Sequence, residues 1–167
     1  MCYLDEVVEA RQDTVVVLHP LTDHRRMLPI DKTGEHIDAA PGFQLVVSYN
    51  PGYQRLMKDM KPSTRQRFVA LDFTFPPAER ELAIVMREGG ADHAVAHALV
   101  ALGNRLRSLQ DRGLAEVPST RLLIAAARLI ASGIDVRDAC LAAIVAPLSD
   151  DPTLVGAMHD LVDATFV

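Results

Sequence analysis

Several features that would assign a protein to a class are missing from this sequence of 167 residues. No apolar run reaches the ~18 residues of a membrane span, and nothing at the N-terminus resembles a signal peptide, so we expect a cytoplasmic protein without membrane insertion. The net charge is −5 and there is no extended run of Lys or Arg, which argues against nucleic acid as the partner. The two cysteines, Cys2 and Cys140, lack metal-type spacing, and we interpret them as buried thiols in a reducing compartment.

A metal site is also not indicated by the histidines. His93 and His97 are four residues apart in a predicted helix, which is a zinc-like spacing. No glutamate follows the first histidine, and there is no obvious third ligand. A solvated or partly buried pair is the better interpretation.

What is present is the composition of a soluble globular protein, with 49% hydrophobic and 23% charged residues. The length suits one domain, or one small domain with a helical appendage. The pattern changes at Pro76 and Pro77, from short apolar runs to helical periodicity. We therefore expect an α/β part over residues 1–77 and an all-helical part over residues 78–167.

Three short apolar runs in the first part are bounded by turn residues or charges, at residues 1–4, 44–49 and 68–73. Such runs are typical of strands buried on both faces of a parallel sheet. Parallel neighbours need a crossover, which is usually helical. We therefore expect a helix over residues 14–24, interrupted at Pro20, although its valine-rich start has strand propensity.

Between the first two strands the sequence predicts a β-hairpin. Residues 26–30 and 35–38 flank a turn in which Gly34 can supply a positive φ. In the second part, helical periodicity begins near residue 78. Ser119 suits an N-cap and Gly133 a helix end. The further helices are expected at residues 94–109, 119–131, 136–146 and 153–164.

The first apolar run ends directly in two carboxylates, Asp5 and Glu6. Ligands of open α/β sheets bind at the carboxyl ends of strands. Asp5 could hold a nucleotide-bound Mg²⁺ there, and Glu6 could orient and polarise an attacking water. Taken alone, the pair is more simply explained by a helix start, where carboxylates favour the dipole.

Asn50 follows the second strand, where it could aim a polar side chain at the same water. The alternative is a turn residue before Pro51 and Gly52, because Asn-Pro is a strong turn dipeptide.

Three arginines are candidates for contacts with phosphate. Arg65 and Arg67 come just before the third strand, and an arginine presented across a subunit boundary can stabilise phosphoryl transfer. The alternative is a solvated basic loop. Arg121 lies in the first turn of a helix, where it opposes the dipole and requires an anionic partner such as a γ-phosphate. A salt bridge to Glu116 is the alternative.

Along the chain, a strand followed by Asp-Glu, a strand followed by Asn, an Arg-x-Arg segment and a helix-opening Arg occur in succession. This order resembles a AAA+ ATPase from its Walker B strand to its lid. The strings LDEVVEARQDTVVVLHPLTDHRRMLPIDKTGE, FQLVVSYNPGYQ, KPSTRQRFVALDF, STRLLIAAARLI and PLSDDP are similar to the CbbQ/NirQ/NorQ group of MoxR-type ATPases. The resemblance covers nearly the whole chain. It implies an α/β fold, a partial P-loop (AAA+) parallel sheet followed by an all-helical lid subdomain, with ATP and Mg²⁺ as cofactors.

The resemblance also implies a role for each candidate residue in ATP hydrolysis, and a pore-facing position for the hairpin. The residues are Asp5 and Glu6 (Walker B pair, Asp5 toward Mg²⁺), Asn50 (sensor 1), Arg67 with Arg65 as second candidate (arginine finger) and Arg121 (sensor 2). Members of the group form hexameric rings. They work with a von Willebrand A-domain partner and activate metalloenzymes, Rubisco in one branch and nitric oxide or nitrite reductase in another.

The sequence departs from the group's pattern in one respect. No segment matches G-x-x-x-x-G-K-[ST], so the phosphate-binding loop and its lysine are absent. Met1 falls inside the expected Walker B strand, which suggests a truncated gene or an internal start. The strands at residues 44–49 and 68–73 would then lack their common neighbour. We expect ATP hydrolysis in the complete protein and none in this chain alone. The alternative is a non-catalytic module that docks into a ring or onto the partner.

Overall fold

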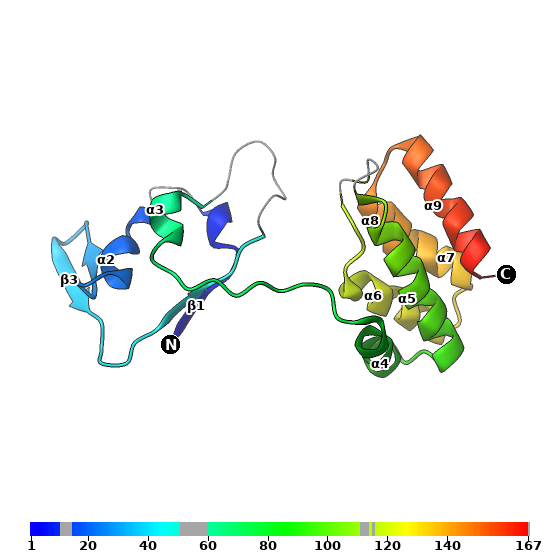
Figure 1. The fold of residues 1–167 in the computed structure, drawn as a ribbon, viewed down its shortest axis with the longest axis horizontal. Helices are drawn as coiled ribbons and strands as arrows, with labels where there is room; N and C mark the ends of the chain where they lie inside the picture. The colour runs from blue at the N-terminus through cyan, green and yellow to red at the C-terminus, as the bar shows by residue number, and fades with distance from the viewer. Residues whose placement is uncertain (11–14, 51–59, 111–113, 115, 167) are drawn as a thin grey trace. The chain divides into compact units, whose positions relative to one another are not determined.

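A computed structural model describes residues 1–10, 15–50, 60–110, 114 and 116–166 of the chain (Figure 1). Two compact units, Met1–Asp72 and Phe73–Val167, account for the fold. All strands of the described residues belong to the first unit, and the second unit is helical. None of the described helices combines the length and the hydropathy that crossing a bilayer requires.

The first unit is built on a two-stranded parallel sheet. Strand β1 (Cys2–Leu4) pairs with β4 (Leu45–Val47), and Leu4 lies opposite Val47. This confirms the parallel pairing predicted for the first two apolar runs. Because both strands run in the same direction, the residues that follow them emerge at one edge of the sheet.

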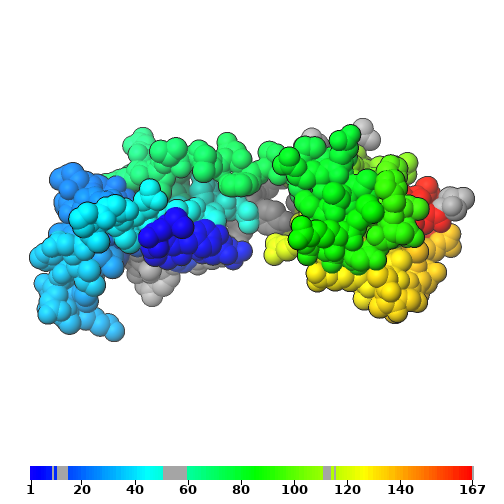
Figure 2. Space-filling model, turned by 90° about the horizontal axis from the view of Figure 1, so that it is seen from below, coloured from blue at the N-terminus to red at the C-terminus, as the bar shows by residue number. Residues whose placement is uncertain are grey.

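The predicted hairpin is confirmed. Strands β2 (Met27–Ile30) and β3 (Glu35–Asp38) pair antiparallel, and Gly34 in their turn has φ 70°. A glycine adopts this left-handed conformation without the steric cost that a Cβ would add. The hairpin projects from the rest of the first unit in both views (Figures 1 and 2).

The third predicted strand is wrong. Residues 68–73 form no ladder with any residue that the structure describes, and Val69, Leu71 and Phe73 are 93%, 79% and 93% exposed. The short apolar run favours a strand, but a strand is stable only beside a neighbour that takes up its backbone groups and side chains. No such neighbour lies beside this segment among the described residues.

The predicted crossover helix is shorter than expected. Residues 15–16 are helical, and after a turn α2 (His19–Thr22) forms a single turn. Pro20 lies in the first turn of α2, where a proline's missing N–H is tolerated, so it does not interrupt a longer helix. Residue 14 lies outside the described residues. Two further short helices were not predicted, the 3₁₀ turn η1 (Val7–Glu9) and α3 (Pro62–Arg65).

The second unit confirms the helical prediction. Its long helices are α4 (Ala78–Gly89), α5 (His93–Arg107), α6 (Thr120–Ala131) and α9 (Pro152–Thr165). Between α6 and α9 run α7 (Val136–Cys140), the π-helical turn η3 (Leu141–Val145) and α8 (Ala146–Leu148). Pro147 in α8 lacks a helical donor and crowds the carbonyl four residues back, which accounts for the wider π turn before it.

The core of the second unit lies between these helices. Leu99, Leu102 and Leu106 of α5 pack with Leu123 of α6 and Ile144 of η3, all without exposed surface. Each buried side chain of this size contributes roughly 1.5–3 kcal/mol. The face of this unit seen in Figure 2 is covered largely by α4 and α5, in green.

One glycine determines how closely two of these helices pack. A Cβ placed on Gly89 of α4 would lie 2.4 Å from the Cβ of Ala127 in α6. Only a residue without a side chain fits this contact, so Gly89 allows the close packing of α4 on α6.

Candidate functional site

The two carboxylates after β1 lie beside the end of β4. Asp5 and Glu6 follow β1 directly, and Ser48 follows β4. The Ser48 hydroxyl donates to Asp5 Oδ1, and the Tyr3 hydroxyl donates to the same oxygen at 2.8 Å. The Glu6 N–H donates to Ser48 Oγ at 3.2 Å. The structure therefore places an Asp-Glu pair at the carboxyl end of a parallel sheet, as the motif requires.

The surroundings of Asp5 keep its carboxyl group ionised. Hydrogen bonds from Ser48 and then from Tyr3 lower the pKa of Asp5 below its ordinary 3.8. Both side-chain donors bond to Oδ1, so Oδ2 takes no side-chain hydrogen bond from the described residues. Proteins bind Mg²⁺ with one or two carboxylates together with substrate phosphates and water. An exposed, ionised Asp5 fits such a ligand.

Glu6 has an unusual backbone conformation, with φ 49° and ψ 44°. A residue with a side chain seldom adopts this left-handed region, and such residues cluster at functional sites. Glu6 precedes η1, but its side chain makes no capping hydrogen bond. The helix-capping explanation of this residue therefore has no contact to support it.

Asn50, the expected sensor 1 residue, lies three residues beyond β4 and is exposed. It makes no hydrogen bond to Asp5 or Glu6, all three being described residues. Ser48, which the sequence reasoning missed, is the residue of this segment that contacts Asp5. Its polar side chain within the apolar run of residues 44–49 is the one local signal that could have pointed to it. The alternative turn at Pro51 and Gly52 lies outside the described residues.

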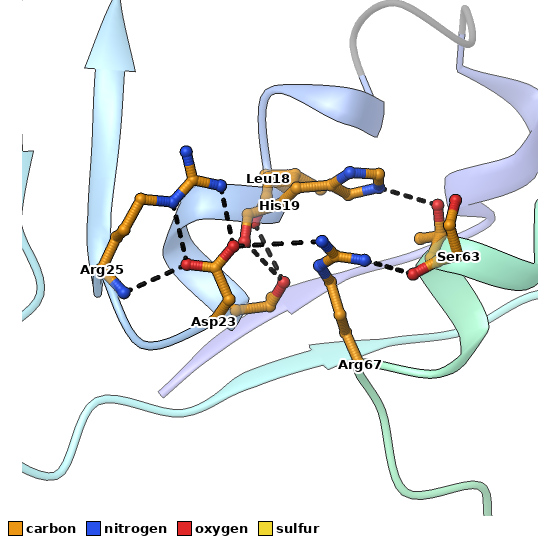
Figure 3. A network of polar contacts seen from close by, with 8 residues as sticks. Leu18, His19, Asp23, Arg25, Ser63 and Arg67 are labelled. Carbon is orange, nitrogen blue, oxygen red and sulfur yellow. Dashed lines mark hydrogen bonds and ion pairs between the residues drawn. The ribbon is translucent and has the colours of Figure 1, made fainter.

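Arg67, the expected arginine finger, is held within the first unit (Figure 3). Its guanidinium donates to the Ser63 carbonyl and lies 4.0 Å from the Asp23 carboxylate. Asp23 also accepts from Arg25 Nε at 3.0 Å and from Arg25 Nη2 at 2.7 Å. These hydrogen bonds from Arg25 hold the pKa of Asp23 well below its usual range. Asp23 is therefore ionised, and its carboxylate lies close to the guanidinium groups of both Arg25 and Arg67.

A second contact joins the elements that carry this cluster. Nε2 of His19 in α2 lies 2.8 Å from Oγ1 of Thr64 in α3, and Thr64 is buried. Burial, together with the charge of Arg67, lowers the pKa of His19, so the ring is neutral at pH 7. Arg65, the second finger candidate, is exposed, and its side chain makes no hydrogen bond or ion pair with a described residue.

Arg121, the expected sensor 2 residue, lies in the first turn of α6 in the second unit. Its side chain makes no hydrogen bond or ion pair with any described residue, so the alternative salt bridge to Glu116 is not formed. Residues 73–76 and 119–121 line a pocket of about 530 Å³ beside it. Arg121 is thus free to bind an anion. Its assembly into one site with the candidates of the first unit stays a prediction.

The histidine pair lies on α5. The rings of His93 and His97 stack with their centroids 6.2 Å apart and their planes 12° from parallel. Across the part of the chain that the structure describes, no three His, Cys, Asp or Glu side chains are grouped as a metal site would require.

Comparison with known proteins gives matches along nearly the whole chain. The family model "AAA domain (dynein-related subfamily)" matches residues 1–68, and "CbbQ/NirQ/NorQ C-terminal" matches residues 81–165. The denitrification regulatory protein NirQ of Pseudomonas aeruginosa is 59% identical over 163 residues, which is 98% of the chain and 63% of NirQ. Protein NorQ of Paracoccus denitrificans and protein CbbQ of Hydrogenophilus thermoluteolus are each 55% identical over 166 residues, 99% of the chain and 62% of each relative. The chain therefore spans about three fifths of the length of the curated relatives it matches.

Proposed function

The chain belongs to the CbbQ/NirQ/NorQ group of MoxR-type AAA+ proteins, and on that premise we propose that the complete protein is an ATPase that activates a metalloenzyme. The observation that carries the ATPase proposal is the edge of the β1–β4 sheet. An ionised Asp5 is held there by Ser48, with Glu6 as the next residue.

In this proposal each residue of the sheet edge has one task. Asp5 would hold Mg²⁺, which when bound neutralises charge on the phosphates of ATP. Ser48 and Tyr3 keep Asp5 ionised and fix the orientation of its carboxylate. Glu6 would orient the attacking water and accept its proton. Asn50 would aim its amide at the same water.

The arginines would stabilise the charge of the transferred phosphoryl group. We propose that Arg67 does so across a subunit boundary, with Arg65 as second candidate, and that Arg121 contacts the γ-phosphate in its own subunit. Mixing tests the first role. Arg67→Ala subunits should regain activity when mixed with Glu6→Gln subunits, because some interfaces then combine one intact Arg67 with one intact Glu6. Absence of any recovery at every mixing ratio would rule out a role across the boundary.

The target and the partners are proposed from the group. The complete protein would form a hexameric ring and would act with a von Willebrand A-domain protein on nitric oxide or nitrite reductase, or on Rubisco. Support comes from the relatives, since NirQ is named a denitrification regulatory protein and the CbbQ relative is nearly as similar. Each target can be tested by co-expression with and without the protein. Equal specific activity of every candidate metalloenzyme in both cases would exclude an activator.

The decisive experiment uses an extended protein, in which an upstream segment carrying a G-x-x-x-x-G-K-[ST] motif precedes residue 1. We expect the extended protein to bind and hydrolyse ATP, and this chain alone to do neither, because the phosphate cradle is not in its sequence. An extended protein that assembles and binds ATP but never hydrolyses it would contradict the proposal. That outcome would favour the alternative, a module that docks into a ring or onto the partner without catalysis.

A further inference from the structure

A buried ion pair lies beneath the start of α6, the helix that carries Arg121. Glu81 of α4 has no exposed surface. Its two carboxylate oxygens accept from Nη1 and Nη2 of Arg107 in α5, each at 2.7 Å. The Thr120 hydroxyl donates to Oε1 of the same carboxylate at 2.7 Å. We refer to Glu81, Arg107 and Thr120 as the clamp.

The clamp holds the chain on both sides of the α6 N-cap. Thr120 is the first residue of α6, and Arg107 Nε donates to the carbonyl of Pro118 at 2.9 Å. The guanidinium of Arg107 also lies over the ring of Phe75, 3.9 Å from its centroid. The clamp therefore joins α4, α5, the start of α6 and the segment that precedes α4. Arg121 is the next residue along the chain.

The start of α6 differs from the starts of α5, α7 and α9. An aspartate side chain caps each of those three helices, Asp92, Asp135 and Asp151 respectively. Ser119 at the N-cap of α6 makes no side-chain capping bond. The Thr120–Glu81 hydrogen bond fixes this helix start instead, and the negative charge of Glu81 complements the helix dipole.

Glu81 is ionised despite its burial. Burial alone would raise the pKa of Glu81, but the hydrogen bonds from Arg107 and Thr120 and the charge of Arg107 together lower it below the ordinary 4.5. A buried ion pair is often replaceable by apolar residues without loss of stability. A clamp of this kind is therefore better explained by the geometry it imposes than by stability alone.

We propose that Glu81 and Arg107 are positioning residues for Arg121. They hold residues 118 and 120, and so set the direction in which the first turn of α6 presents the Arg121 guanidinium to the triphosphate. The inference rests on the function proposed above, and it names two residues that act through Arg121 without touching the nucleotide.

The test uses Thr120, because Glu81→Gln would leave Arg107 buried without its counter-charge and could unfold the unit. Thr120→Val removes one hydroxyl, and Thr120→Ser keeps it. Thr165→Val is the matched control, since the Thr165 hydroxyl donates to the Leu161 carbonyl, accepts from Arg105 Nη1 and has no hydrogen bond with a member of the clamp.

The first measurement is amide exchange in the full chain. The amides of Leu122 and Leu123 both donate to the Ser119 carbonyl and report on the first turn of α6. We expect Thr120→Val to raise the exchange rate of these amides about tenfold, because it removes a hydrogen bond to a charged group that stabilises the first turn. Thr120→Ser and Thr165→Val should change the rate little. Unchanged exchange in Thr120→Val would overturn the proposal.

The second measurement is ATP turnover by the extended protein. We expect Thr120→Val to lower kcat about tenfold with little change in KM, because a displaced catalytic group loses transition-state contacts. Thr120→Ser should restore most of the rate. In an Arg121→Ala background, Thr120→Val should have no further effect, since the clamp acts through Arg121.

The two measurements separate the possible failures. An equal loss of kcat from Thr120→Val with and without Arg121 would overturn the positioning role. No turnover by the unsubstituted extended protein would overturn the proposed function, and the amide exchange result would still decide whether the clamp orders the start of α6.

Discussion

Individual charged side chains in this protein are held by groups that are remote in the sequence. Asp5 accepts from Ser48, 43 residues away, and Arg107 pairs with Glu81, 26 residues away. In both cases a hydrogen bond keeps a carboxylate ionised, at the sheet edge in one unit and at a helix start in the other. The chemistry of the carboxylates therefore depends on the tertiary fold as well as on the motif.

The thiols give a prediction at the same scale. Cys140 is fully buried, and burial raises the pKa of its thiol to about 12, whereas Cys2 is only partly buried, contrary to the prediction from sequence. At pH 8 only about one Cys140 in ten thousand is a thiolate. We expect iodoacetamide to modify Cys140 at least roughly a hundredfold more slowly than Cys2 in the native chain. Mass spectrometry over time measures both rates, and modification of Cys140 as fast as Cys2 would refute the buried position.

From the sequence alone, candidate site residues could be predicted where they lie at the ends of predicted strands or helices. Asp5, Glu6 and Arg121 are candidates from the sequence because each directly follows or opens a predicted element. The partners of Ser48 and Glu81 could not be predicted, because Asp5 and Arg107 lie 43 and 26 residues away from them in the sequence. Their roles come from strand register and helix packing, which a single sequence does not display.

Among the elements, the sequence pattern predicted those whose packing or pairing partners lie within the same unit. The long helices of the second unit bury leucines against one another, and the hairpin pairs with itself. Residues 68–73 form an apolar run typical of a strand but have no ladder among the described residues, and Val69, Leu71 and Phe73 stay exposed. Periodicity reports which face of a segment is apolar, and it does not supply the neighbour that a strand needs.

The close packing of α4 on α6 can be tested by comparing the same Gly→Ala substitution at two positions. Gly89→Ala should destabilise the second unit by about 1–3 kcal/mol, because the new methyl group would overlap Ala127. Gly156→Ala in α9 meets no atom within 4 Å and should stabilise the helix by roughly 0.5–1 kcal/mol. Urea unfolding followed by circular dichroism measures both. Equal effects of the two substitutions would contradict the close contact of α4 and α6.

The two units should also differ in amide exchange. The β1–β4 ladder pairs three residues of each strand, while α5 and α6 lie in a continuous apolar core. In the chain alone we expect fast exchange over the described part of residues 1–73 and slow exchange in α5 and α6, because an isolated strand pair is marginally stable. Uniformly slow exchange in the monomeric chain, measured by mass spectrometry, would show that the first unit is stable without a further strand.

For the whole molecule, the proposed ATPase function would draw on residues of both units. The first unit would contribute Asp5, Glu6, Asn50 and Arg67 and the second Arg121, while the phosphate-binding loop is not in this sequence. The order of these motifs along the chain was enough to predict the family, which the matches to family models and relatives then showed.

The central claim, that this chain supplies the hydrolytic residues of a AAA+ ATPase, is tested most directly at Glu6. In the extended protein, ATP affinity and turnover should be measured side by side for the unsubstituted form and for Glu6→Gln. The amide keeps the shape of the side chain but cannot accept a proton from water, so we expect near-normal ATP binding and a loss of turnover of roughly 10²- to 10⁴-fold. Turnover within a factor of about two of the unsubstituted protein, with ATP bound equally well, would contradict the claim.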